Sequence, residues 1–178
     1  MLLRPQMFLA DAIGHFITQT GWRRVAMAVC ADVYCEGLAE GTKAHLALQG
    51  IVPLFEETIP ASVIAPDGRL YLSKLKAGFE RHRDASCADG PDLGPPIVIL
   101  CAHADAHHLL EAETDQEFQP LWIAGEGMAS SFIAWDLAAM DAQNTAMFMV
   151  RPVDPAVTEK RTHLTSQVAS QDQWVPIA

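Results

Sequence analysis

The chain has 178 residues, half of them hydrophobic, which is enough for one domain with a substantial core. Its formal net charge of −10, from 12 basic and 22 acidic residues, leaves no basic footprint for nucleic-acid binding. The longest apolar runs, such as 96–102, are too short for a membrane span, and Pro5, Gln6 and Asp11 interrupt the signal-peptide pattern at the amino terminus.

The first predicted elements are a helix, a strand and a second helix. Apolar residues recur at helical spacing before Gly21, at Leu9, Ala12, Ile13, Phe16 and Ile17. The continuous apolar run 25–30 is typical of a strand covered on both faces in a parallel sheet. An acidic turn at 31–34 leads into a helix over 36–48, which Gly50 is expected to end in a left-handed conformation. Gly37 and Gly41 share a face of this helix and predict a close approach to a strand.

The rest of the chain continues the alternation of strands and helices. A loop rich in Asp, Gly and Pro is expected at 82–96, and a weakly patterned tail after 152. The further expected strands are 51–58, 97–100, 121–124 and 147–150, and the further expected helices are 69–80, 104–113 and 130–137. This order predicts an α/β fold, doubly wound, with a mostly parallel sheet of about five strands and helices on both faces. Such sheets bind ligands at the carboxyl ends of their strands.

Three segments carry a resemblance to a known family. Gly21-Trp22 precedes the first strand, Asp32-Val33-Tyr34-Cys35-Glu36-Gly37 follows it, and Trp122-Ile123-Ala124-Gly125-Glu126-Gly127 forms a later strand and turn. In order and spacing they resemble the type I periplasmic-binding-protein fold, in the branch of branched-chain amino-acid binding proteins, natriuretic-peptide receptor ectodomains and class C G-protein-coupled receptor ectodomains. The sequence departs from the family at Cys35, where Gly is usual, and at Glu126, where Asp is common. The 82–96 loop looks like an insertion.

The resemblance implies one half of a two-lobed receptor. Residues 1–152 would form the second lobe with its hinge segments, and 153–178 a weakly structured tail. The first lobe would be missing, so a small amino-acid-like ligand would be held only by hinge closure with that lobe. The family context also implies the extracellular or periplasmic side of a membrane, with attachment through a larger parent protein.

The resemblance assigns ligand contacts to residues that follow the strands. Tyr34 and Glu126 match the aromatic and acidic residues that contact the amino group of an amino-acid ligand. Asp32, Glu36 and Met128 are expected to line the same edge. The surface around Tyr34, Glu126 and Met128 is also expected to be apolar, and an isolated lobe with such a patch would form a homodimer.

Other chemistry receives less support from the sequence. His103, His107, His108 and Glu111 form the best metal candidate, because His103, His107 and Glu111 are spaced by four and would share a helix face. The alternative is a chance cluster on an exposed amphipathic helix. No metal or other cofactor is expected. Ser130 and Ser131 lack the GxSxG pattern of a nucleophile elbow, so a non-enzymatic binding module is predicted. The alternative is a stand-alone α/β signalling or interaction domain, such as a receiver, in which Asp32, Glu36 and Glu126 would form an acidic site.

Four cysteines are too few for a disulfide scaffold at this length. Cys30 and Cys101 lie in apolar strands and are expected to be buried thiols. Cys35 and Cys87 are expected to be exposed, where they can pair with each other.

Overall fold

The fold is an α/β domain built on an all-parallel, five-stranded sheet in the order β2-β1-β3-β4-β5. The computed structural model describes residues 5–63, 65–82, 94–103, 106–112, 118–128 and 147–149. The strands are β1 (Val25–Cys30), β2 (Glu56–Ile59), β3 (Ile97–Cys101), β4 (Leu121–Ala124) and β5 (Met147–Met149). The helices are α1 (Pro5–Thr20), α2 (Val33–Leu48), α3 (Ala65–Arg81), α5 (His107–Glu111) and the short 3-10 helix η3 (Glu126–Met128).

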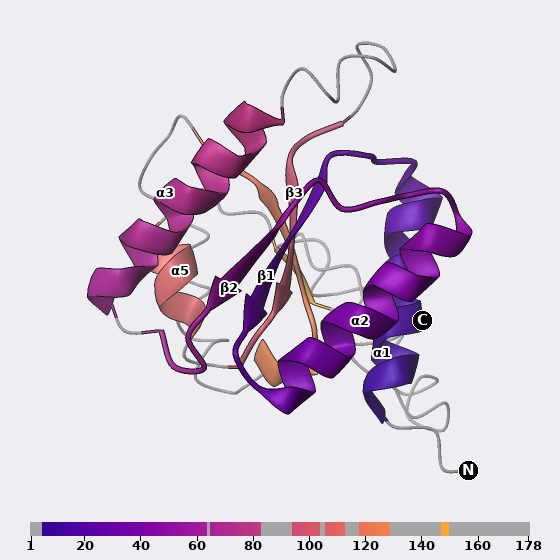
Figure 1. The fold of residues 1–178 in the computed structure, drawn as a ribbon, viewed down its shortest axis with the longest axis horizontal. Helices are drawn as coiled ribbons and strands as arrows, with labels where there is room; N and C mark the ends of the chain where they lie inside the picture. Colours follow the sequence, from indigo (N-terminus) through magenta and orange to yellow (C-terminus); the bar gives the residue numbers. More distant parts are fainter. Residues whose placement is uncertain are drawn as a thin grey trace, which may run out of the picture.

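The helices lie in two layers with the sheet between them (Figure 1). α1 and α2 pack side by side on one side of the strands, and α3 and α5 pack together on the other. Because both faces of the sheet are covered, every residue of β1, β3 and β4 is buried. The continuous apolar runs of the sequence therefore predicted these three strands correctly.

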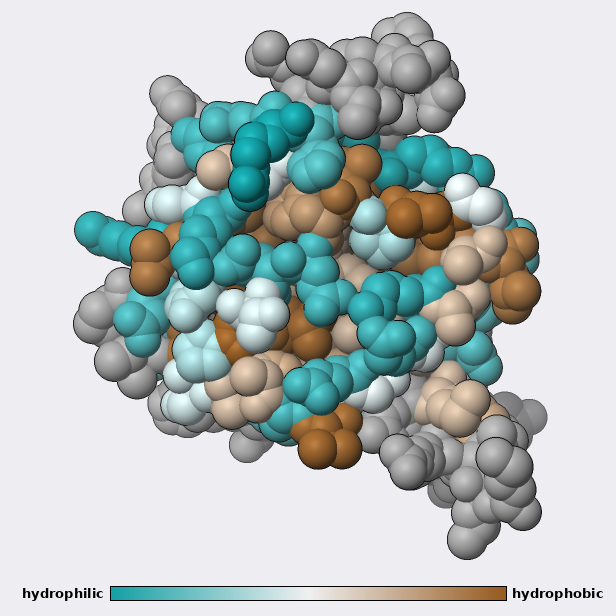
Figure 2. Space-filling view, in the orientation of Figure 1, coloured by the Kyte–Doolittle hydropathy of each residue, from teal (hydrophilic) through white to brown (hydrophobic). Residues whose placement is uncertain are grey.

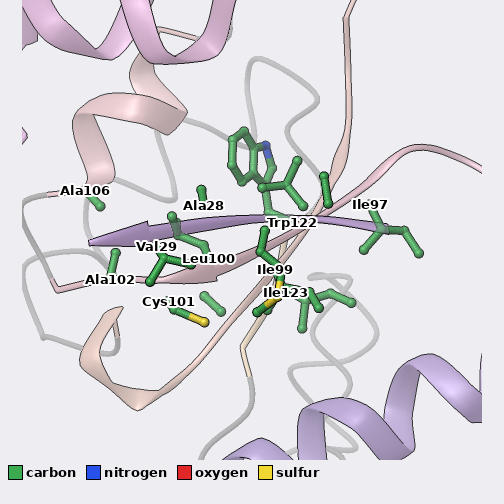
Figure 3. Packing of buried hydrophobic residues seen from close by; sticks show 14 of the residues in the cluster. Ala28, Val29, Ile97, Ile99, Leu100, Cys101, Ala102, Ala106, Trp122 and Ile123 are labelled. Atoms are coloured by element: carbon green, nitrogen blue, oxygen red, sulfur yellow. The ribbon is translucent and has the colours of Figure 1, made fainter. Parts of the chain in front are cut away.

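The core fills both sides of the central strands. Trp122 is fully buried and lies on the opposite side of the sheet from Ile99 and Ile123, as the alternation of side chains along a strand requires (Figure 3). Cys101 lies on the same side as Ile99. The side chains on the two sides thus join the sheet to both helical layers in one cluster.

The two amino-terminal helices approach each other closely at glycines. A Cβ atom at Gly41 of α2 would lie 2.8 Å from Ala10 Cβ of α1, and one at Gly14 of α1 would lie 2.5 Å from His45 Cδ2 of α2. The expectation that Gly41 brings its helix close to a strand is therefore wrong, because this glycine faces the neighbouring helix. Gly50 adopts a φ of 69°, which confirms the left-handed end of α2.

The β2 edge of the sheet is shorter and more polar than expected. The strand predicted over 51–58 is confined to Glu56–Ile59, and lysines from two helices pair with its glutamates. Lys43 of α2 contacts Glu56 at 3.0 Å, and Lys74 of α3 contacts Glu57 at 2.9 Å. Charged side chains on an edge strand disfavour pairing with another chain. Figure 2 shows the same character more widely, with hydrophilic side chains spread over the visible face and hydrophobic ones in separate groups.

Several other predicted boundaries shift. α2 begins at Val33 rather than 36, and α3 begins at Ala65 rather than 69. α5 is described over His107–Glu111, within the expected 104–113, of which 104, 105 and 113 lie outside the described residues. The helix expected at 130–137, most of the 82–96 loop and the tail after 152 lie outside the described residues. Within the described part of the chain, no helix is long and apolar enough to cross a membrane.

Candidate functional site

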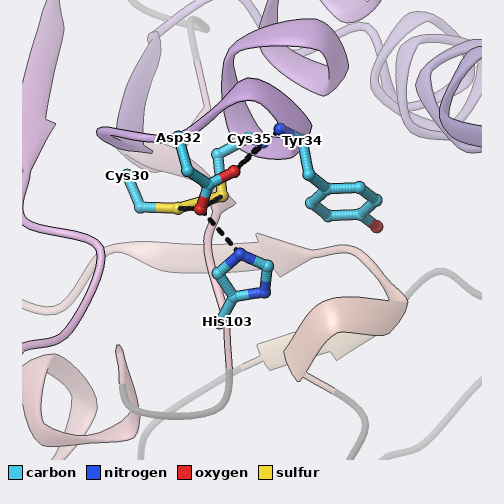
Figure 4. Close-up of polar contacts among 5 residues, drawn as sticks. All are labelled: Cys30, Asp32, Tyr34, Cys35 and His103. Atoms are coloured by element: carbon cyan, nitrogen blue, oxygen red, sulfur yellow. Dashed lines mark hydrogen bonds and ion pairs between the residues drawn. A yellow bond between two sulfur atoms is a disulfide. The ribbon is translucent and has the colours of Figure 1, made fainter.

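The ends of β1 and β3 create the site. The two strands are parallel neighbours, and Val29 of β1 is paired with Cys101 of β3. Asp32 lies three residues after Val29, and His103 lies two residues after Cys101. Their side chains meet, with Asp32 Oδ2 2.7 Å from His103 Nε2 (Figure 4).

Asp32 begins helix α2. Its backbone is extended, and its Oδ1 accepts hydrogen bonds from the amides of Tyr34 at 2.8 Å and Cys35 at 2.9 Å. This is the N-cap arrangement, which satisfies amides that have no partner within the helix. Burial alone would raise the pKa of Asp32. The Cys35 amide, the contact with His103 and the Tyr34 amide together outweigh burial and lower the pKa below its ordinary value.

Cys30 and Cys35 form a disulfide that joins the end of β1 to the first turn of α2 (Figure 4). Both cysteines are completely buried. The expectations of a Cys30 thiol and an exposed Cys35 are therefore wrong, because the turn folds Cys35 back under the strand. Cys101 is a buried thiol as predicted, and Cys87 lies outside the described residues. Asp32 Oδ2 also lies 2.9 Å from Cys30 Sγ and 3.4 Å from Cys35 Sγ.

Tyr34 lies beside this cluster and links it to the end of β4. Its ring stacks on the imidazole of His103, with the ring centroids 5.5 Å apart. A Cβ atom at Gly127 of η3 would lie 2.7 Å from the carbonyl oxygen of Ala102 and 3.5 Å from Tyr34 Cε1. Only glycine allows this approach, so the turns after β1, β3 and β4 meet at one edge.

The other three predicted ligand residues, Glu126, Glu36 and Met128, lie in three different environments. Glu126 begins η3, and Gly125 alone separates it from the end of β4, which puts its backbone at the same edge as Tyr34. Glu36 is exposed in the first turn of α2, where a carboxylate favours the helix dipole. Met128 is completely buried. The expected apolar surface therefore does not include Met128, which packs in the core beneath the edge.

The predicted group of three histidines and Glu111 is divided in two. His103 precedes α5 and contacts Asp32, so it does not share a helix face with His107 and Glu111 as expected. Within α5, His108 Nδ1 lies 2.7 Å from Glu111 Oε2, and His107 Nε2 lies 3.7 Å from Glu111 Oε1.

The partnership between Asp32 and His103 was missed by the sequence reasoning. The signal was present, because both residues follow strands of a parallel sheet and such strands end at a common edge. The order of the strands was the missing information, since β2 intervenes in the sequence between β1 and β3. The resulting site offers a carboxylate, a phenol ring and two sulfur atoms from the turn after β1 and an imidazole from the turn after β3.

Comparison of the sequence with protein-family models and with curated proteins gives no match. The fold and the residues at this edge are therefore the basis for a proposed function.

Proposed function

We propose that this chain is the ligand-binding lobe of a type I periplasmic-binding-protein-like receptor or solute-binding protein for a small amino-acid-like ligand. The observation that carries the proposal is the meeting of Tyr34, His103 and the η3 turn at the carboxyl edge of the sheet. In open parallel sheets, ligands bind at this edge. A ligand site at this edge would give Tyr34, His103 and the η3 turn, which lie in three distant segments of the chain, a common role.

The proposal includes a doubly wound sheet, the finer form of the α/β architecture. The order β2-β1-β3-β4-β5 supports it, because the strand order reverses between β1 and β3. Asp32 follows β1 and His103 follows β3, so the site lies at the reversal.

Each residue at the edge has a distinct part in the proposal. The ligand ammonium would lie against the Tyr34 ring, and Glu126 would supply the paired carboxylate. Asp32 would position the turn, since both of its oxygens already accept contacts within the site. Glu36 would add negative potential, and Met128 would support the edge from beneath.

These contacts are too weak for one lobe to retain a ligand. A cation over a tyrosine ring and an adjacent carboxylate together contribute about 1–3 kcal/mol. Millimolar binding requires about 4 kcal/mol. The proposal therefore includes a partner lobe that captures the ligand carboxylate and closes over it. It also places the lobe outside a membrane, within a larger protein, and an oxidising compartment suits the Cys30–Cys35 disulfide.

Calorimetry with a panel of amino acids tests the proposal. The chain alone should give no measurable heat of binding, and a first lobe from a related receptor should restore binding. Tyr34→Ala and Glu126→Ala should each abolish the restored signal. The matched control is Tyr71→Ala, which removes the other tyrosine of the chain, on α3, and should leave binding unchanged. Sub-millimolar binding by the chain alone that survives Tyr34→Ala would overturn the proposal.

A further inference from the structure

The proposed ligand site gives no role to the two sulfur atoms that lie beside the Asp32 carboxylate. Cys30, Asp32, Cys35 and His103 each offer one donor atom, and these four atoms all lie within 4.8 Å of one another. We propose that reduction of the Cys30–Cys35 disulfide converts this group into a four-ligand Zn²⁺ site. The disulfide and the zinc complex are then two alternative states of the same strand-to-helix turn.

The carboxylate of Asp32 is the common neighbour of the other three groups. Its Oδ2 lies 2.7 Å from His103 Nε2, 2.9 Å from Cys30 Sγ and 3.4 Å from Cys35 Sγ. A disulfide sulfur has no proton to donate to this oxygen. The short sulfur–oxygen contacts are instead suited to thiols that donate to the carboxylate, or to a cation that the carboxylate and the two sulfur atoms bind together.

The donor set matches the preferences of Zn²⁺. Two thiolates, an imidazole nitrogen and a carboxylate oxygen are ligands of tetrahedral zinc, whereas Mg²⁺ and Ca²⁺ prefer oxygen alone. The Tyr34 and Cys35 amides hold the Asp32 carboxylate by its other oxygen, as outer hydrogen bonds orient metal ligands elsewhere.

Burial of the four residues gives the site a closed side and an open side. Cys30 and Cys35 are completely buried, while the side chains of Asp32 and His103 are 27% and 45% exposed. A metal ion can therefore enter past the histidine and carboxylate and reach sulfur atoms that are shielded from water. The same burial excludes a large disulfide substrate and argues against a role for these cysteines in thiol exchange with another protein.

Reduction of the Cys30–Cys35 disulfide by an external thiol is a balanced reaction. Two thiol molecules supply two electrons and two protons, the Cys30–Cys35 bond breaks, and the products are two cysteine thiols and one external disulfide. Zn²⁺ then binds both sulfurs as thiolates and releases their two protons to solvent. A disulfide oxidant reverses the sequence and expels the metal.

The second histidine group of the chain is a weaker candidate. His107, His108 and Glu111 provide three donors on a helix of five residues, all of them partly or fully exposed. They have no sulfur ligand, so thiolate absorption distinguishes the two sites.

Anaerobic titration with Co²⁺, which reports thiolate ligands and tetrahedral geometry in its spectrum, tests the inference. The chain is reduced with a phosphine, in denaturant followed by refolding if the buried bond reacts slowly, and circular dichroism verifies the fold. One equivalent of Co²⁺ should give thiolate charge-transfer bands and intense d–d bands, and Zn²⁺ should displace it. The disulfide form should give neither band. A folded, reduced chain without thiolate–cobalt absorption would overturn the inference.

Variants assign the ligands. His103→Ala and Asp32→Asn should each weaken Co²⁺ binding by at least about tenfold, because each removes or weakens a donor. Cys35→Ser should remove one thiolate from the charge-transfer intensity. If that variant does not fold, the two other variants decide the matter. The matched controls are the double variant His107→Ala/His108→Ala and the variant Cys101→Ala, and both should bind like the parent. Binding that survives His103→Ala but is lost in the double α5 variant would overturn the assignment.

Discussion

Asp32 is the residue on which the edge depends. One oxygen accepts the amides that begin α2, and the other contacts His103 and the two sulfur atoms. A side chain in this position fixes the direction in which α2 leaves β1, and with it the place of Tyr34. Local hydrogen bonding by one residue thus determines where a residue of the proposed ligand site lies.

Substitution of Asp32 separates its two roles. Asp32→Ala should lower the free energy of unfolding by about 1–2 kcal/mol, since loss of an N-cap acceptor costs this much. Asp32→Asn retains a cap oxygen and should lose less than the alanine variant. Urea denaturation measures both values, and equal losses in the two variants would show that the cap is not the source of the stability.

The lowered pKa of Asp32 predicts a pH dependence of stability. The unfolded chain binds this proton more tightly than the folded chain, so the carboxylate contributes its full stabilisation above the ordinary pKa of 3.8. That contribution is lost as the pH falls through the lower pKa of the folded state. The difference in unfolding free energy between the parent and Asp32→Asn should therefore shrink in acid. A difference that stays constant from neutral pH to well below the ordinary pKa would contradict this assignment.

Cys101 should be unreactive in the folded chain. Complete burial raises the pKa of its thiol to about 12, and at pH 8 only about one thiol in ten thousand would then be the reactive thiolate. Alkylation followed by peptide mapping should find Cys101 unmodified without denaturant and fully modified with it. Rapid modification under native conditions would show that the end of β3 opens to solvent.

At the scale of elements, continuous apolar runs were sufficient to locate the central strands. The runs at Val25–Cys30 and Leu121–Ala124 match the observed strands in full, and β3 is one residue longer than predicted. The β2 strand was located less well because its residues Glu56 and Glu57 carry no apolar periodicity. α2 begins earlier than predicted because Asp32 caps it, so that the helix starts at the next residue, Val33.

Part of the candidate site, Tyr34 and Glu126, could be predicted from the sequence, whereas the contact of His103 with Asp32 and the disulfide could not. Tyr34 and Glu126 were assigned to one edge because each follows a strand, and their backbones do follow β1 and β4. His103 lies 71 residues from Asp32, and pairing of β1 with β3 brings them together. Local patterns indicate that strands are parallel, but they do not give the order of the strands. The disulfide was missed for a local reason, since the inward direction of Cys35 depends on where α2 begins.

Packing of α3 against α5 predicts an unusual response at Gly68. Replacing a helical glycine by alanine ordinarily stabilises a protein by roughly 0.5–1 kcal/mol. Here the new Cβ would lie 2.2 Å from the carbonyl oxygen of His108, a backbone atom that cannot turn aside. Gly68→Ala should therefore destabilise the fold by about 1–3 kcal/mol, as overpacking does.

Thermal or urea unfolding of Gly68→Ala measures this effect. The control is Ser73→Ala, an exposed position of the same helix that should change stability by less than about 0.5 kcal/mol. A stabilised Gly68→Ala variant would mean that α3 and α5 are not packed so closely.

At the scale of the whole molecule, the parallel sheet brings the residues of the candidate site to one edge. The helical layers cover both faces, and charged pairs flank the β2 side. The turns after β1, β3 and β4 carry the aromatic, acidic and sulfur groups that the sequence made conspicuous. The central proposal is therefore that ligands bind at this carboxyl edge.

Nuclear magnetic resonance of the isotope-labelled chain, titrated with amino acids, tests that claim most directly because it detects binding too weak for calorimetry. The amide signals that shift should belong to Cys30–Glu36, His103 and Gly125–Met128, and Tyr34→Ala should remove the shifts. Shifts centred on α3 and α5 or on the opposite edge around Arg24 and Ile97, or shifts unchanged by Tyr34→Ala, would contradict the account.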